Sequence, residues 1–357
     1  MAVLTEEQTM LRDMAREWAD RESPVAAFRR MRDAAPAQFY DADAWRAQAE
    51  MGWPGILVPE AHGGVGMDHQ SLGIVVEQLG RTLVATPLAA TAAATDAILL
   101  GGSAEQQARW LPRIAAGECV AALAVDEGPR FAPDSIATNV SNGRLDGLKR
   151  FVAEGDSATL FVVAAVDGMY LVERGDGVSV APRRMADARS HAEVVFAQAP
   201  ADRLAGGGAD LLEQVADRAA AVACAEMLGM AEAAFEATNA YLKTRVQFGQ
   251  VLSSFQALQH RMAKMFTELE LMRSVVEGAL EAIDGARADV AQSVSLAKAV
   301  AGDTLHLVSR EMIQLHGGIG MTDEHDAGFY LKRARVLEAQ WGSAAWHRQR
   351  FARLAGY

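Results

Sequence analysis

The sequence predicts an α+β multidomain chain with an N-terminal α-helical domain over residues 1–118, a middle antiparallel β domain over 119–205 and a C-terminal helical bundle over 206–357. Three observations predict this order. Apolar residues recur at helical spacing up to about residue 118, short apolar runs divided by turn dipeptides follow, and long alanine-rich helical patterns fill the remainder. Of the 357 residues 50% are hydrophobic, which is ample for more than one core.

The N-terminal part opens with a helix-start signal. Thr5 and Gln8 have the spacing of a capping box, in which each side chain bonds the other residue's backbone N–H. The apolar positions that follow lie on one face of a helix: Leu11, Met14, Ala15 and Trp18. Further helical runs fill the region from Ala44 to Glu118, interrupted by a Pro/Gly-rich loop, ILVPEAHGGVGM.

The sequence pattern of the middle part is typical of a β domain. Its short apolar runs are separated by dipeptides that favour tight turns, namely Asn142-Gly143, Asp146-Gly147, Asp167-Gly168 and Asp176-Gly177. The segment 205–210, AGGGAD, reads as a linker by composition. Beyond it the periodicity is helical almost to the end of the chain.

Charge and composition exclude several classes of function. The net charge of −12 and the pI of about 5.2 disfavour binding to nucleic acid or to anionic membranes. The apolar tracts are interrupted by polar residues, so we expect no membrane insertion, and an N-terminus charged from its sixth residue predicts a cytoplasmic protein. Cys119 and Cys224 lack metal-ligand spacing and are expected to be small buried hydrophobes.

Three segments together resemble the acyl-CoA dehydrogenase family: YLKTRVQFGQVLSSFQALQHRMAKM (241–265), QLHGGIGMTDEHDAGFYLKRA (314–334) and VPEAHGGVGM (58–67). The resemblance implies that family's fold, with a C-terminal four-helix bundle, and FAD as cofactor. It implies an acyl-CoA substrate oxidised between Cα and Cβ, with an electron-transfer flavoprotein as redox partner. Family members are usually tetramers, in which each FAD is held by the β domain of one subunit and the C-terminal bundle of its neighbour.

The resemblance assigns six residues to the neighbour's FAD: Arg245, Phe248, Gln256, Gln314, Gly317 and Gly318. A guanidinium can bind two phosphate oxygens at once and stays charged, which suits Arg245 to the pyrophosphate. Glycine lacks Cβ, so main chain at the Gly317-Gly318 turn can approach a ribose or phosphate closely. The alternatives are a solvated arginine at a helix end and an ordinary glycine-capped turn between helices.

No catalytic residue is identified. The family's carboxylate directly precedes Gly-Thr near the C-terminus, where this chain has Trp341 before Gly342-Ser343, and an indole cannot abstract a proton. The family's second position aligns near Ala219, and Asp217 would serve only if that alignment were shifted. His316 and His325 are separated by the glycine turn and lack a neighbouring cysteine, so we expect structural histidines and no metal site.

The positions that would face the flavin ring also depart from the family. Its Thr-Glu-Pro stretch is Asp126-Glu127-Gly128 here, and its Trp-x-Thr is Phe151-Val152-Ala153. We therefore expect the chain to lend the ADP-binding half of the FAD site in an α2β2 complex with a homologous acyl-CoA dehydrogenase subunit, as in small subunits of steroid acyl-CoA dehydrogenases. The alternatives are a self-sufficient homotetramer with an unrecognised base, and a non-redox scaffold or acyl-CoA-binding subunit.

Overall fold

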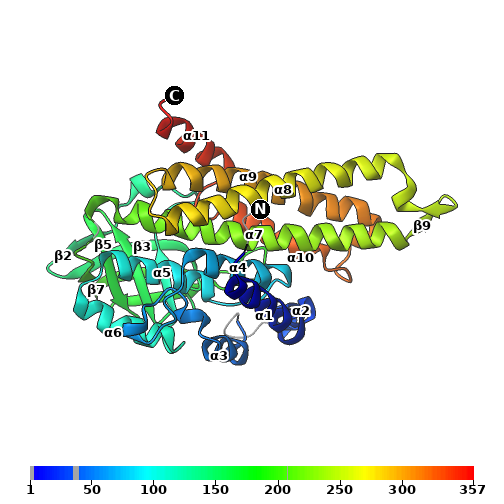
Figure 1. Ribbon diagram of the computed structural model, residues 1–357. Helices are drawn as coiled ribbons and strands as arrows, with labels where there is room; N and C mark the ends of the chain where they lie inside the picture. The colour runs from blue at the N-terminus through cyan, green and yellow to red at the C-terminus, as the bar shows by residue number, and fades with distance from the viewer. Residues whose placement is uncertain (1–3, 35–39, 207) are drawn as a thin grey trace. The chain divides into compact units, whose positions relative to one another are not determined.

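The computed structural model describes residues 4–34, 40–206 and 208–357 (Figure 1). The chain divides into two compact units. The first consists of Met1–Phe28, Gly73–Val84 and Ala221–Tyr357, and the second of Arg29–Leu72 and Ala85–Ala220. The predicted order of a helical part, a β part and a second helical part is confirmed, while the three domain boundaries stay a prediction.

Among the described residues, six α-helices precede the first strand: α1 (Glu6–Glu22), α2 (Val25–Ala34), α3 (Ala42–Glu50), α4 (His69–Arg81), α5 (Leu88–Gly101) and α6 (Ala104–Ala115). The expected capping box at Thr5 and Gln8 is confirmed, with both reciprocal hydrogen bonds at 3.1 Å. Of the predicted apolar face Leu11, Ala15 and Trp18 are buried. Met14, predicted on the same face, is 42% exposed.

The β part consists of two four-stranded sheets. One has the strand order β1 (Ala121–Ala124), β4 (Leu160–Ala165), β5 (Gly168–Glu173), β8 (Asp202–Arg203), and the other the order β2 (Asn139–Ser141), β3 (Arg144–Ala153), β7 (His191–Pro200), β6 (Val178–Pro182). Their inner faces share one apolar core, in which the rings of Phe161 on β4 and Phe196 on β7 meet edge to face at 5.9 Å. Such T-shaped pairs are favoured by the ring quadrupoles.

Two details of the β part differ from expectation. The sheet is not wholly antiparallel, because β1 pairs in parallel with β4. The chain between these strands forms the β2–β3 hairpin of the other sheet, so it can return to β1 in the same direction. Asp146-Gly147 is no turn but lies within β3 at a register shift, where a Cβ on Gly147 would approach the Thr138 hydroxyl to 2.3 Å.

The C-terminal part is built from α7 (Leu211–Thr244), α8 (Gln256–Asp284), α9 (Val290–His316), α10 (Ala327–Ala339) and α11 (Ala344–Leu354). A short hairpin of β9 (Val246–Gln247) and β10 (Gln250–Val251) connects α7 to α8 and extends beyond the end of the long helices (Figure 1). Of the predicted linker 205–210, residue 207 lies outside the described residues.

None of the helices in the described part of the chain combines the length and the apolar composition of a membrane-spanning segment.

Within the first unit, α4 crosses α7 at two glycines. A Cβ on Gly229 would lie 1.8 Å from the Glu77 carbonyl oxygen, and one on Gly80 would lie 2.6 Å from that of Glu226. The backbones therefore meet at a distance that only glycine permits. Glu226 also forms a two-pronged ion pair with Arg333 of α10, at 2.8 and 2.9 Å, which ties a third helix to the crossing.

Candidate functional site

The β9–β10 hairpin presents the first predicted motif at one end of the bundle. Phe248 and Gly249 form its tip with φ of 54° and 81°, the left-handed geometry of a tight hairpin turn. The Phe248 side chain is 89% exposed. Arg245 follows the last residue of α7 and is exposed, while its carbonyl oxygen accepts from the Leu252 N–H at 2.8 Å and closes the base of the hairpin.

The second motif ends α9. Gly317 has φ 65° and ψ −139°, a combination open to glycine and to few other residues. A Cβ built on Gly317 or on Gly318 would meet no atom within 4 Å, so open space lies beside this stretch of main chain. Gln314, in the last turn of α9, and Gln256, the first residue of α8, are both exposed.

The structure brings the two motifs together through Tyr241 and His316. Their rings stack with centroids 4.4 Å apart and planes 30° apart, and the Tyr241 hydroxyl donates to the His316 carbonyl oxygen at 3.3 Å. The ring of His325 also contacts that of His316, with centroids 4.4 Å apart and planes tilted by 48°. The expectation that the two histidines stand apart was therefore wrong, although among the described residues no group of three His, Cys, Asp or Glu could hold a metal ion.

Asp126 and Glu127, in the segment after β1, lie near the buried ammonium of Lys149. Glu127 accepts hydrogen bonds from the ammonium of Lys149 at 2.7 Å, from the Thr138 hydroxyl at 2.6 Å and from the backbone N–H of Ala137 at 2.7 Å. Burial pushes the pKa of Glu127 up, but these hydrogen bonds outweigh it and hold the pKa at about 2. Glu127 is thus committed to the buried Lys149 as an internal ion pair.

Asp126 and Phe151 both belong to the second unit. The Arg150 N–H donates to the Asp126 carbonyl oxygen at 2.6 Å, which joins the segment after β1 to β3. Burial raises the pKa of the Asp126 carboxyl to about 6, against the opposing charge of Lys149, so this group is ionised at neutral pH. Phe151 has φ 52° and is 41% exposed.

The turn between α10 and α11 carries Trp341 in the left-handed region, with φ 57°, followed by Gly342 with φ 98°. The ammonium of Lys298 donates to the carbonyl oxygens of Gly342 at 2.9 Å and Leu337 at 3.0 Å. His347 donates from Nε2 to the Trp341 carbonyl oxygen at 2.8 Å. Burial lowers the pKa of Lys298 to about 8 and that of His347 to about 3. The turn is therefore fixed by two buried donors and presents an indole.

The comparisons with known proteins agree with this architecture. The family model described as "Acyl-CoA dehydrogenase, N-terminal domain" matches residues 5–118, and the one described as "Acyl-CoA dehydrogenase, C-terminal domain" matches residues 206–355. The acyl-CoA dehydrogenase IpdE2 of Mycobacterium tuberculosis is 33% identical over 334 residues, covering 92% of this chain and 91% of IpdE2. The chain belongs to the acyl-CoA dehydrogenase family.

Other relatives extend this result. The acyl-CoA dehydrogenase FadE34 of Mycobacterium tuberculosis is 32% identical over 359 residues, and this chain spans about half of its length, 48%. Among solved structures, a variant of the Tcur3481-Tcur3483 steroid ACAD matches with a TM-score of 0.91 and 28% identity, covering 98% of both chains. The ChsE4-ChsE5 complex from Mycobacterium tuberculosis matches with a TM-score of 0.91 and 25% identity, covering all of both chains.

Acyl-CoA dehydrogenases are oxidoreductases that act on CH–CH bonds and typically bind FAD. The six residues predicted to bind a neighbour's FAD, called the clamp residues below, fit the ADP part of that cofactor, because an exposed guanidinium, exposed amides and open space beside two glycines are available at one end of the bundle. The flavin-ring positions do not fit. Asp126 carries a negative charge at a position where a positive or neutral group would help the flavin ring to accept hydride. Ala153 has no side-chain hydrogen-bond donor for that ring.

The second expected base position carries an alanine, with Asp217 two residues earlier on the same helix. Ala219 is 5% exposed and Asp217 is equally buried on α7. Between them Arg218 reaches Asp96 of α5 at 3.7 Å, and Asp96 accepts from His69 of α4 at 3.0 Å. This histidine–aspartate pair, of which Asp96 is buried and His69 partly buried, was missed in the sequence, where 27 residues separate the two and no motif marks either.

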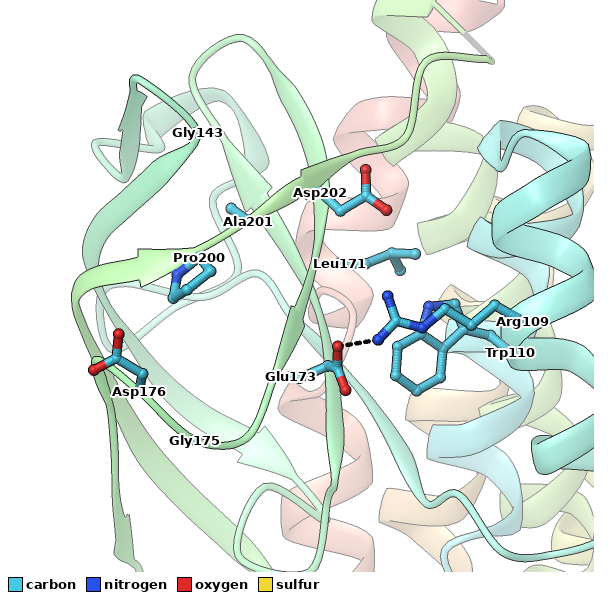
Figure 2. A pocket seen from close by; sticks show the side chains of 10 residues that line it. All are labelled: Arg109, Trp110, Gly143, Leu171, Glu173, Gly175, Asp176, Pro200, Ala201 and Asp202. Atoms are coloured by element: carbon cyan, nitrogen blue, oxygen red, sulfur yellow. Dashed lines mark hydrogen bonds and ion pairs between the residues drawn. The ribbon is translucent and has the colours of Figure 1, made fainter.

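Two pockets on the surface are lined by residues other than those predicted to bind FAD. The first, of 340 Å³, lies between α6 and the β4–β5–β8 sheet, where Figure 2 shows Arg109 over Trp110 and paired with Glu173. The second, of 480 Å³, lies in the first unit between α1, α4, α7 and α8 and is lined by paired arginines and carboxylates such as Arg81 with Glu232. None of the clamp residues lines either pocket, and all six are exposed.

Proposed function

We propose that this chain is a subunit of an FAD-dependent acyl-CoA dehydrogenase, and that it lends the ADP-binding half of the FAD site to a homologous subunit in an α2β2 complex. The partner subunit supplies the catalytic carboxylate and the pocket for the flavin ring. The complex desaturates an acyl-CoA thioester between Cα and Cβ and passes the electrons to an electron-transfer flavoprotein. FAD, when bound, supplies the hydride acceptor.

A single contrast carries the proposal. The residues assigned to a neighbour's FAD are present and accessible, as the exposed Arg245 and the open space beside Gly317 show. The residues that a subunit needs for its own reaction are replaced, with Trp341 and Ala219 at the two base positions and Asp126 in the stretch that matches the family's flavin-facing residues. A subunit that both lent and used a flavin site would need both sets.

The role of each residue follows from its chemistry. The fork of Arg245 pairs with oxygens of the pyrophosphate, and the hairpin keeps it at the end of α7. Gly317 and Gly318 let main-chain N–H groups face the ADP part without a Cβ between them. Gln256 and Gln314 offer amide donors and acceptors to the adenosine or ribitol hydroxyls, and Phe248 offers an apolar surface at the hairpin tip.

The experiment is to produce the chain alone and together with a homologous acyl-CoA dehydrogenase subunit that carries a carboxylate before Gly-Thr or on its first C-terminal helix. Native mass, flavin absorbance per chain and acyl-CoA-dependent dye reduction are measured for both. We expect the co-produced pair to form a four-chain complex with FAD and activity, and the chain alone to hold little flavin. A yellow, fully active homo-oligomer of this chain alone would refute the proposal and support the homotetramer.

A substitution separates the proposal from the scaffold alternative. R245A in the complex should lower the FAD content and weaken FAD binding, because removing one partner of a charge-assisted phosphate contact costs about 2 kcal/mol or more. K243A is the matched control, since Lys243 is an exposed cation two residues earlier on the same helix end. If R245A and K243A retained FAD equally, the scaffold reading would be favoured.

We further propose that the acyl group of the substrate is steroid-derived. The support is the likeness over the whole fold to the Tcur3481-Tcur3483 steroid ACAD. A panel of straight-chain, branched and steroid-side-chain acyl-CoA thioesters, assayed with the active complex, tests this. A higher kcat/KM for a straight-chain thioester than for every steroid-derived one would contradict it.

A further inference from the structure

Three rings contact one another in series and are called the stack below: Tyr241 is stacked on His316, and His325 is tilted against His316 by 48°. Tyr241 lies on α7, His316 is the last residue of α9, and His325 lies just before α10. The centroid distances are 4.4 Å from Tyr241 to His316 and 4.4 Å from His316 to His325. The stack therefore connects three helices of the first unit at the end from which the β9–β10 hairpin extends.

Hydrogen bonds fix each histidine in one orientation. His316 Nδ1 faces the Met312 carbonyl oxygen at 2.7 Å, so this nitrogen carries the proton. His325 Nδ1 accepts from the Ala327 N–H at 3.1 Å, so its proton is on Nε2. His316 is 3% exposed, and burial lowers the pKa of its imidazole, which keeps the ring neutral.

The stack touches the backbone of both motifs. The Arg245 N–H donates to the Tyr241 carbonyl oxygen at 2.9 Å, one helical turn along α7. Gly317 directly follows His316, whose carbonyl oxygen accepts from the Tyr241 hydroxyl at 3.3 Å. A shift of Tyr241 relative to His316 would therefore also shift Arg245 relative to the Gly317-Gly318 turn.

We propose that Tyr241 and His316 are positioning residues, which set the separation between Arg245 and the Gly317-Gly318 turn before the diphosphate part of a dinucleotide binds. This inference rests on the proposed function and names its preorganising element. Ordering of free side chains and loops on binding weakens affinity by about three- to tenfold for each immobilised group. The stack removes that cost in advance, because neither ring nor turn has to be ordered by the ligand.

The test uses the co-produced complex with Y241F, which keeps the ring but loses the hydroxyl, and Y241L, which loses both. FAD release after dilution is followed by the rise in flavin fluorescence. We expect release to be about threefold faster in Y241F and about tenfold faster or more in Y241L. F235L is the control, because Phe235 and Phe266 form another ring pair between α7 and α8, with centroids 6.3 Å apart.

A second measurement does not depend on FAD. Hydrogen exchange of the chain alone should become faster in residues 246–251 and 314–321 in Y241L and stay unchanged there in F235L. Equal release and exchange in Y241L and wild type would overturn the inference, as would equal effects of Y241L and F235L. If the wild-type complex held no FAD while exchange still responded to Y241L, the proposed function would fail but the positioning contact would stand.

Discussion

Lys298 and Gly342 are joined by a hydrogen bond of 2.9 Å from a fully buried ammonium to a main-chain carbonyl oxygen. The same ammonium donates to the Leu337 carbonyl oxygen at 3.0 Å. It therefore caps the C-terminal end of α10 and also fixes the turn that follows. Trp341, between these carbonyls, keeps a left-handed φ of 57°, which costs a bulky residue about 1 kcal/mol or more. Such a conformation persists only where its surroundings hold it.

Replacement of Lys298 by methionine should therefore loosen this turn. K298M keeps the volume of the stem but leaves buried carbonyl oxygens without their donor, at about 1–3 kcal/mol for each unsatisfied group. We expect a clear fall in the melting temperature of the chain and altered tryptophan fluorescence. W341F identifies the part of the fluorescence that comes from the turn. A K298M protein with wild-type melting and emission would show that Lys298 does not hold the turn.

His347 gives the chain a predictable weakness to acid. Its pKa is lowered from 6.5 to about 3 in the fold, chiefly by burial, so between these values the unfolded chain binds a proton that the folded chain does not. Its contribution to stability is complete above pH 6.5 and declines by about 1.4 kcal/mol per pH unit below it. H347Q retains a donor at the Nε2 position without titrating.

Thermal unfolding at pH 7.5 and pH 5.5 measures this effect. We expect the melting temperature of wild type to fall more between these pH values than that of H347Q. The comparison within each protein cancels any constant cost of the substitution. Parallel falls in the two proteins would show that His347 does not carry the acid sensitivity.

The sequence predicted those features that depend on neighbouring residues. The Thr5–Gln8 capping box and the turn at Asn142-Gly143 each follow from a few adjacent side chains, and the structure contains them. The exposure of the six clamp residues is consistent with their assignment by motif, but their contact with FAD stays a prediction.

Features that depend on distant residues were not predictable from one sequence. Nothing near Lys149 or Lys298 indicates burial, because lysine is ordinarily exposed and the carbonyl and carboxylate partners come from other elements. The parallel β1–β4 pair and the His316–His325 contact arise in the same way, from the path of the chain through the fold. Local patterns carry no information about such partners.

Asp126 should lower stability at neutral pH. Its pKa is raised from 3.8 to about 6, mainly by burial, so the folded chain binds the proton more tightly than the unfolded chain between these values. Stability is complete below pH 3.8 and is lost as the pH rises through 6, by about 3 kcal/mol at most. D126N should therefore raise the melting temperature at pH 7.5 more than at pH 4.5.

D134N is the control for this prediction, since Asp134 is an exposed carboxylate in the same part of the chain. It should change the melting temperature little at either pH. A D126N protein that gained no stability at pH 7.5 would show that the Asp126 carboxylate is better solvated or paired than its surroundings indicate. It would also weaken the argument that its charge opposes a flavin ring.

Two glycines within long helices allow a test of the α4–α7 crossing. Gly229 of α7 has no room for a Cβ, which would lie 1.8 Å from the Glu77 carbonyl oxygen and 2.7 Å from its carbonyl carbon. These are backbone atoms, so neither can rotate away. G229A should cost about 3 kcal/mol or more, because α4 and α7 must separate and the ion pairs beside the crossing must move with them.

Gly278 of α8 is the matched control, because a Cβ there meets no atom within 4 Å. Alanine favours the helical state over glycine, so G278A should raise stability by about 0.5–1 kcal/mol. Thermal melts of the two variants should therefore shift in opposite directions from wild type. If G229A were as stable as G278A, the helices would cross with more space than the structure shows, and the backbone contact of α4 with α7 would not be the feature that selects glycine at position 229.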